Sequence, residues 1–166
     1  MNKEIRNRKN AVRHNCLNLK RNHPQFKDLN INNVEIYFDV ESDFNEIQEI
    51  IKLNRDKFDQ ILYTIFSNQI NESIYGREDI SEKAKGITAM KFSGAINSRI
   101  YCKEISGEKE KKKIVLSKTY KHKNFQKATN KKIVPIIESL ARTDFTFFNS
   151  IQDYDKKVLK NEKTNK

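Results

Sequence analysis

A change in the spacing of apolar residues along one stretch of the chain constrains the fold most. Val34, Ile36 and Phe38 alternate with polar residues, which is the two-residue period of a half-buried strand. Directly after them, apolar residues recur at helical spacing, first over 44–51 and then over 58–66. We therefore expect one strand followed by two helices, whose apolar faces pack against a sheet.

The second half of the chain predicts more strands and one more helix. Three further strands are expected, at Ile87–Phe92, Arg99–Ile105 and 113–123. Short polar connections between these strands are typical of antiparallel hairpins. A helix is expected to begin near Asn130, so that Pro135 falls about one turn inside it, where a missing N–H does least harm.

These elements predict an α+β fold with a small antiparallel sheet of about four strands, packed by two N-terminal helices and one C-terminal helix. Residues 34–150 would form this domain. Residues 1–33 are expected to be an extra basic N-terminal arm or a loosely docked helix with a thin apolar stripe. The stripe consists of Val12, Cys16 and Leu19. Residues 151–166 are expected to be a charged, flexible tail.

Positive charge is concentrated in one part of the chain. Residues 91–132 contain thirteen lysines and arginines against three glutamates, a net charge of +10 within the total of +11. Residues 34–90 carry −6. Such asymmetry is typical of a protein with one face that binds a polyanion such as nucleic acid, although lysines can also serve solubility alone.

Several classes of function lack their sequence signals. The two cysteines have neither disulfide nor zinc spacing, which favours a reducing cytoplasm. Apolar runs are too short to cross a membrane, and no phosphate-binding glycine loop or nucleophile elbow occurs. We expect no cofactor and no metal.

An acidic cluster at Asp39, Glu41 and Asp43 could hold Mg²⁺, but capping of the next helix explains it more simply. His14 and His23 are interpreted as surface or phosphate contacts.

Proton-transfer groups lie inside the basic region. On an extended strand, Lys118, Tyr120 and His122 share one face, together with the apolar Ile114 and Leu116. That face would have to change from buried to open along the strand. The alternative is that these residues have no catalytic role, with a half-buried tyrosine, an exposed histidine and lysines that only solvate the end of the strand.

The order of strand, two helices, three antiparallel strands and a helix resembles the RelE/ParE superfamily of bacterial toxins, and its HigB-like branch most of all. The resemblance covers residues 34–142 and is carried by Val34–Asp39, Arg99–Ile105 and the basic exit of 114–123. It implies a cytoplasmic toxin, neutralised by an antitoxin, that cleaves mRNA on the ribosome without a metal.

Cleavage of this kind needs a base for the ribose 2′-OH, cations for the phosphorane and an acid for the 5′-oxygen. The candidate catalytic residues are His122, Tyr120, Arg99 and Lys91. The candidate RNA-binding residues are Lys118, Lys121, Lys123, Lys127 and Lys103. His122 is the better single proton-transfer candidate by residue type.

Two other functions stay open. A non-catalytic RNA- or DNA-binding module, including a gyrase-inhibiting relative, would share the positive field without proton transfer. A partner-binding protein, such as a phage accessory factor, would instead use the acidic helices of residues 42–70.

Overall fold

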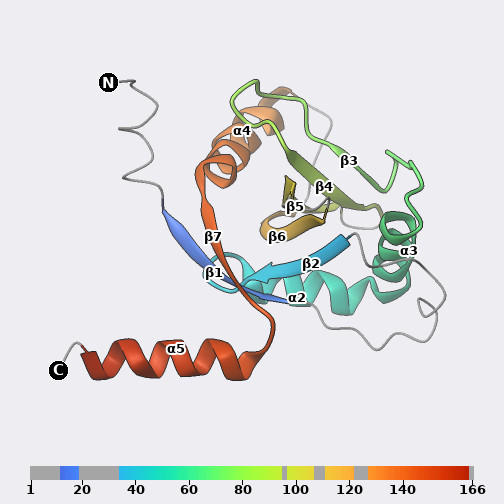
Figure 1. Cartoon of the computed structure of the whole chain (residues 1–166). Coiled ribbons are helices and arrows are strands. Elements are labelled where there is room, and N and C mark those ends of the chain that lie inside the picture. Colours follow the sequence, from blue (N-terminus) through green and yellow to red (C-terminus); the bar gives the residue numbers. More distant parts are fainter. Residues whose placement is uncertain (1–11, 19–33, 95–96, 107–110, 122–126, 165–166) are drawn as a thin grey trace.

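The computed structural model describes residues 12–18, 34–94, 97–106, 111–121 and 127–164, and within them forms one mixed sheet (Figure 1). The seven strands are β1 (Arg13–Asn18), β2 (Val34–Asp39), β3 (Tyr75–Arg77), β4 (Ile87–Phe92), β5 (Ser98–Ser106), β6 (Lys112–Tyr120) and β7 (Asp144–Phe148). The helices in these described ranges are α2 (Phe44–Leu53), α3 (Arg55–Phe66), α4 (Lys127–Arg142) and α5 (Ile151–Thr164). The strands lie in the order β3-β4-β5-β6-β2-β1-β7. The pairs β2–β6 and β1–β7 are parallel, and the other pairs are antiparallel.

The fold is α+β, but the prediction of a small four-stranded antiparallel sheet with three helices is wrong. Strands β2, β4, β5 and β6 and helices α2, α3 and α4 lie where the sequence predicted them. Three strands, β1, β3 and β7, and helix α5 are additional. Two of the added strands, β1 and β7, extend the sheet beyond β2, but the parallel pairing of β2 with β6 already makes the sheet mixed.

The N-terminal segment that was expected to be an arm or a weak helix contains strand β1. Cys16 is the one fully buried residue within β1, so the segment has too little apolar alternation to reveal a strand. Its backbone pairs with β2 on one side and with β7 on the other. Whether residues 34–150 fold as a unit stays a prediction, but β1 joins the same sheet.

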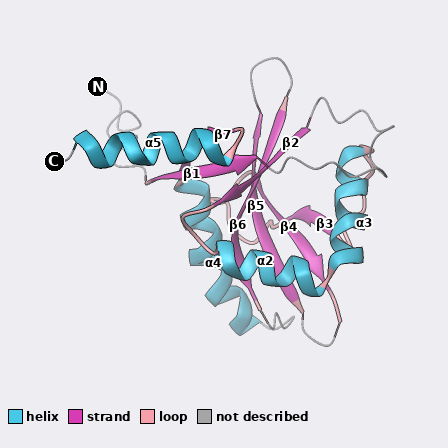
Figure 2. Ribbon diagram, turned by 90° about the horizontal axis from the view of Figure 1, so that it is seen from below, coloured by secondary structure: helices cyan, strands magenta, loops and turns pink. Residues whose placement is uncertain are grey.

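The two faces of the sheet carry separate cores. Figure 2 shows the helices and the sheet strands that contribute to them. Helices α2 and α3 cover the first face with residues such as Ile47, Phe58 and Leu62. Helix α4 covers the second face with Ile133, Ile137 and Leu140, which pack against residues from β1, β2, β4, β5, β6 and β7. Because α4 crosses the second face, side chains at the ends of these strands lie around its margins.

The C-terminal segment, expected to be a flexible tail, forms helix α5. None of its residues is buried, and it extends away from the sheet (Figure 1). Its attachment includes an edge-to-face contact between Tyr154 and Phe148 of β7, with ring centroids 5.7 Å apart. Lys157 lies over the same Phe148 ring, with its Nζ 5.1 Å from the centroid.

Pro135 lies in the middle of α4 rather than in its first turn, because the helix begins at Lys127. The proline removes one backbone donor from the helix interior. The buried residues on either side of it, Ile133 and Ile137, keep the apolar face of α4 against the sheet. Tertiary packing therefore maintains a helix that the local sequence would have started later.

Both thiols are expected to be inert in the folded protein. Cys16 and Cys102 are each 0% exposed, and burial raises the pKa of both thiols above the ordinary value. Iodoacetamide should therefore modify them in urea but not under native conditions. Above pH about 8.5 the unfolded chain loses thiol protons that the folded chain keeps, so the free energy of unfolding should fall. Well above this pH, each thiol should lower the free energy of unfolding by about 1.4 kcal/mol per pH unit.

Urea titrations at several pH values between neutral and moderately alkaline would measure this dependence. A variant with both cysteines changed to alanine is the control, and its stability should depend less on pH in this range. Equal alkylation rates in buffer and in urea would contradict the burial of the thiols.

Candidate functional site

Three of the four predicted catalytic residues occupy neighbouring positions on adjacent strands. Lys91 of β4 pairs with Arg99 of β5, which in turn pairs with Tyr120 of β6. Residues that pair across strands point to the same face of a sheet. We call Lys91, Arg99 and Tyr120 the cross-strand row. It lies on the face covered by α4, because Tyr120 packs against the core on that side. The fourth residue, His122, lies outside the described residues.

A β-bulge in β6 decides which face Tyr120 occupies. Cys102 pairs with Leu116 and Tyr101 pairs with Lys118, so Ser117 is an extra residue in β6. The extra residue moves Lys118 and Tyr120 to the face opposite Leu116. The expectation that they share a face with Ile114 and Leu116 is therefore wrong. The bulge also removes the conflict within that expectation, since the buried residues and the basic ones lie on different faces.

Arg99 is the most buried member of the cross-strand row. It is 5% exposed, and its Nη1 donates a hydrogen bond to the carbonyl of Ser98 at 3.1 Å. Its Nε has no hydrogen-bond partner among the described residues. Burial lowers the pKa of the guanidinium group. A buried cation with an unused donor favours the approach of an anion, which would both balance the positive charge and accept a hydrogen bond from the donor.

Two further polar side chains lie close to Arg99. The hydroxyl of Tyr101 is buried and, in the described part of the chain, has no hydrogen-bond partner. Burial raises the pKa of this phenol, and the negative charge of Glu78 raises it further. Glu78 is itself buried and partly compensates the charge of Arg99. Arg99 is therefore buried next to two polar groups, at the margin of an otherwise apolar core.

The outer residues of the row are partly exposed. Lys91 donates from Nζ to the carbonyl of Glu72 at 2.7 Å, which holds its ammonium group near the end of β4. Tyr120 is partly buried, with its ring against the core below α4. The row thus combines two cations and one phenol at one end of the sheet.

The predicted RNA-binding lysines do not form one group. Lys118 lies near the cross-strand row, whereas Lys121 forms an ion pair with Glu49 of α2 at 3.1 Å. Lys123 lies outside the described residues, and the side chain of Lys127, at the start of α4, is not among those described. The remaining lysine, Lys103, makes structural contacts.

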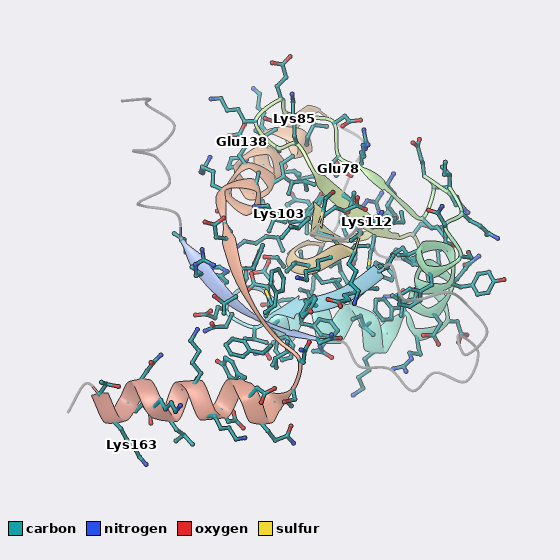
Figure 3. The ribbon with its side chains drawn as sticks, viewed as in Figure 1. Glu78, Lys85, Lys103, Lys112, Glu138 and Lys163 are labelled. Atoms are coloured by element: carbon teal, nitrogen blue, oxygen red, sulfur yellow. The ribbon has the colours of Figure 1, made fainter. Side chains whose placement is uncertain are left out.

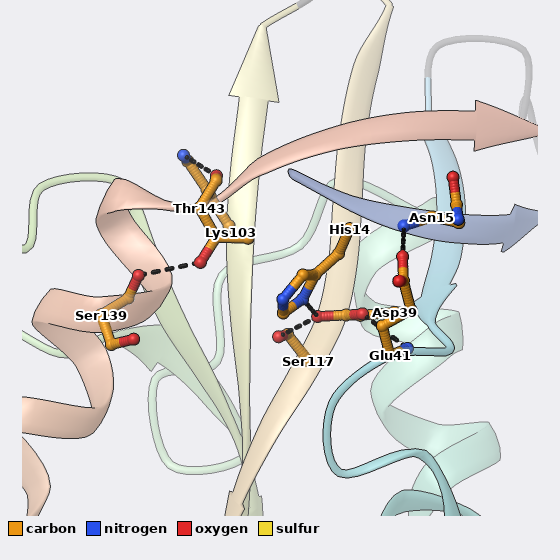
Figure 4. A network of polar contacts seen from close by, with 8 residues as sticks. All are labelled: His14, Asn15, Asp39, Glu41, Lys103, Ser117, Ser139 and Thr143. Carbon is orange, nitrogen blue, oxygen red and sulfur yellow. Dashed lines mark hydrogen bonds and ion pairs between the residues drawn. The ribbon is translucent and has the colours of Figure 1, made fainter. Parts of the chain in front are cut away.

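Lys103 binds the C-terminal end of α4. Its Nζ donates to the carbonyls of Ala141 and Thr143, at 2.9 and 2.7 Å. A cation at this position satisfies the last carbonyls of the helix and complements the helix dipole. Figure 4 shows the contact with Thr143, whose hydroxyl in turn donates to the carbonyl of Ser139 at 2.9 Å. Burial lowers the pKa of the Lys103 ammonium group.

A second polar network connects β1, β2 and β6 through Asp39 (Figure 4). Asp39 is 0% exposed and accepts hydrogen bonds from His14 Nδ1 at 2.8 Å and from Ser117 Oγ at 2.6 Å. Its other oxygen accepts from the backbone N–H of Glu41 at 3.0 Å. His14 and Asp39 were interpreted from sequence as a surface group and part of a helix-capping cluster. No sequence signal connects them, because they belong to separate strands.

This network does not have the geometry of a catalytic triad. In a triad the histidine lies between the serine and the carboxylate, whereas here the carboxylate lies between the other two. Ser117 therefore donates to Asp39 and is not activated as a nucleophile by His14. The network instead fastens β1 and the β6 bulge to the end of β2.

Asp43 has a similar structural role. It is the N-cap residue of α2 but makes no side-chain cap hydrogen bond. Its carboxylate instead accepts from the backbone N–H and the hydroxyl of Thr119, at 2.8 and 3.2 Å. Two members of the acidic cluster that could have held Mg²⁺ therefore contact β6, Asp43 through Thr119 and Asp39 through Ser117.

The described residues lack two kinds of feature. They contain no group of three or more histidine, cysteine, aspartate or glutamate side chains arranged to hold a metal ion. Within the same ranges, no helix has the length and apolar character needed to cross a bilayer. Comparisons with family models, curated proteins and solved structures gave no match to this chain. The arrangement of the residues is therefore the basis for any functional proposal.

Proposed function

We propose that the protein is a toxin-type endoribonuclease that cleaves mRNA on the ribosome without a metal, and that the cross-strand row binds the scissile phosphate. The observation that carries this proposal is the adjacency of Lys91, Arg99 and Tyr120 on one face. The order of β2, α2, α3, β4, β5, β6 and α4 also supports it, although the short strand β3 is inserted before β4, because this order without β3 underlies the resemblance to RelE/ParE toxins.

The proposed roles follow from the chemistry of RNA cleavage. The ribose 2′-oxygen attacks the adjacent phosphorus, and the bond to the 5′-oxygen breaks. A base removes the 2′-proton and an acid protonates the 5′-oxygen, which leaves a 2′,3′-cyclic phosphate and a 5′-OH. Tyr120 and His122 are the candidates for proton transfer. Arg99 and Lys91 would stabilise the phosphorane, with Lys118, Lys123 and Lys127 on neighbouring phosphates.

The proposal includes a cytoplasmic location, a ribosome or RNA partner and an antitoxin. Induced expression should arrest growth, and primer extension should detect new mRNA 5′ ends. Purified protein should cleave mRNA on ribosomes in the presence of EDTA and leave 2′,3′-cyclic phosphate termini. Growth without arrest and intact mRNA at comparable protein levels would refute the proposal. A Lys52→Gln variant should arrest growth and cleave mRNA like the wild type, because Lys52 is exposed on α2, over the face of the sheet opposite the cross-strand row.

A second function is favoured by the burial of Arg99. A guanidinium group that is 5% exposed offers little surface to a substrate, and Lys91 is already bound to a carbonyl. A non-catalytic module that binds RNA through its other lysines would need neither an accessible Arg99 nor an unbound Lys91. Such a protein would bind RNA with strong salt dependence but would yield no cleaved product.

A further inference from the structure

We propose that a cavity between β1, β5 and β7 is a nucleotide-binding pocket, separate from the cross-strand row. Its ligand would be a nucleotide with an aromatic base and a phosphate, either free or as one unit of a single-stranded RNA. The cavity has a volume of 570 Å³. Sites for small ligands have volumes of about 300–1,000 Å³, so a nucleotide fits within this range.

The cavity exists because the sheet is strongly curved. Strands β6, β2 and β1 lie between β5 and β7 in the sheet order. Nevertheless, Lys103 of β5 binds the carbonyl that directly precedes β7, and its Nζ is 5.9 Å from the ring centroid of Phe145. The edge strand therefore folds back over the second face and encloses a hollow beyond the end of α4. In Figure 3 Lys103 lies beside α4 and β7.

One part of the pocket wall is apolar and aromatic. Phe145, Phe147 and Ile105 line it. Phe147 is held by an edge contact with Tyr37, with ring centroids 4.7 Å apart, and is partly exposed. A fixed and accessible phenyl ring is the kind of surface on which nucleobases stack, and this interaction tolerates different bases.

The other part of the wall is cationic. Arg13 donates from Nη1 to the carbonyl of Phe145 at 3.1 Å, and its Nη2 lies 3.8 Å from Asp144. Its side chain is 60% exposed, and a guanidinium group has five donors, so these contacts leave donors for a phosphate. Lys103 is the second cation that lines the pocket. Lys113 is not part of the lining but lies over one face of the Phe147 ring, with its Nζ 4.6 Å from the centroid. Aromatic and cationic groups in one hollow match the two parts of a nucleotide.

Calorimetric titration of the full chain with adenosine monophosphate, adenosine, inorganic phosphate and a hexa-adenylate RNA would test the pocket. We expect the monophosphate to bind more tightly than inorganic phosphate. Arg13→Gln should lower the affinity for adenosine monophosphate by about 10- to 100-fold and should change the affinity for adenosine little. Phe147→Leu should lower the affinity for both ligands by about 10-fold. Lys52→Gln is the control and should bind like the wild type.

The two sources of the nucleotide give different results. If the pocket binds one unit of a single-stranded RNA, the hexanucleotide should bind at least 10-fold more tightly than the monophosphate. The Arg13→Gln substitution should then also lower the affinity for the hexanucleotide. Equal binding of the two would identify a free nucleotide. Equal binding of monophosphate and inorganic phosphate, or unchanged affinity in both variants, would overturn the proposal.

Photolabelling of the wild type with 8-azidoadenosine monophosphate needs no variant. Label should attach to peptides of β1 or β7, and labelling confined to other strands would also overturn the proposal. Neither experiment depends on RNA cleavage. Loss of the proposed nuclease function would therefore leave these results unchanged.

Discussion

Replacing Tyr120 with phenylalanine should lower the rate of mRNA cleavage by about 10²- to 10⁴-fold, which is the usual contribution of a proton-transfer group. The change removes one oxygen atom from a ring that packs against the core below α4. The ring itself stays in place, so the fold and the RNA affinity should change little. Single-turnover cleavage on ribosomes and binding of an uncleavable RNA would measure the two quantities separately.

Tyr154→Phe is the matched control, because Tyr154 lies on α5, outside the cross-strand row, and contacts Phe148 of β7 through its ring. It should cleave at the wild-type rate. Full cleavage by Tyr120→Phe would exclude Tyr120 as the proton-transfer group. Loss of cleavage together with loss of the folded state would instead indicate a structural role for the hydroxyl.

Replacing Asp39 with alanine should destabilise the protein by about 1–3 kcal/mol for each buried donor that loses its acceptor, and so by several kcal/mol in all. Asp39 is fully buried and accepts hydrogen bonds from His14, Ser117 and the backbone of Glu41. The alanine variant leaves these donors without their acceptor, at a cost of about 1–3 kcal/mol for a buried group. Urea unfolding followed by circular dichroism would measure the change.

Asp39→Asn keeps the size of the side chain and one acceptor, and should lose less stability than Asp39→Ala. Asp155→Ala is the control on exposed α5 and should stay within about 0.5 kcal/mol of the wild type. A loss below about 1 kcal/mol for Asp39→Ala would show that the network does not hold β1 and β6 to β2.

The elements with strong local periodicity could be predicted from sequence. Strand β2, helices α2 and α3, and strands β4 to β6 each carry an apolar pattern of the right period. Strands β1 and β7 were missed, because their parallel pairing joins segments far apart in the chain. The alternation of Phe145 and Phe147 around Thr146 was a usable signal for β7.

The candidate site could be predicted only in part. Residue type and strand position brought Lys91, Arg99 and Tyr120 together, and their pairing in the sheet agrees with this. The face that Tyr120 occupies depends on the bulge at Ser117, which has no sequence signature in a strand of nine residues. The contact of His14 with Asp39 depends on the pairing of β1 with β2 and could not be anticipated from either residue.

Cross-linking would test the central proposal most directly. An mRNA fragment with 2′-deoxy substitutions cannot be cleaved and can be cross-linked to the wild-type protein by ultraviolet light, with the attached peptides identified by mass spectrometry. We expect cross-links in peptides that contain Lys91, Arg99 to Tyr101, or Lys118 to Tyr120. Cross-links confined to α2, α3 or α5 would contradict the assignment of the cross-strand row as the RNA site.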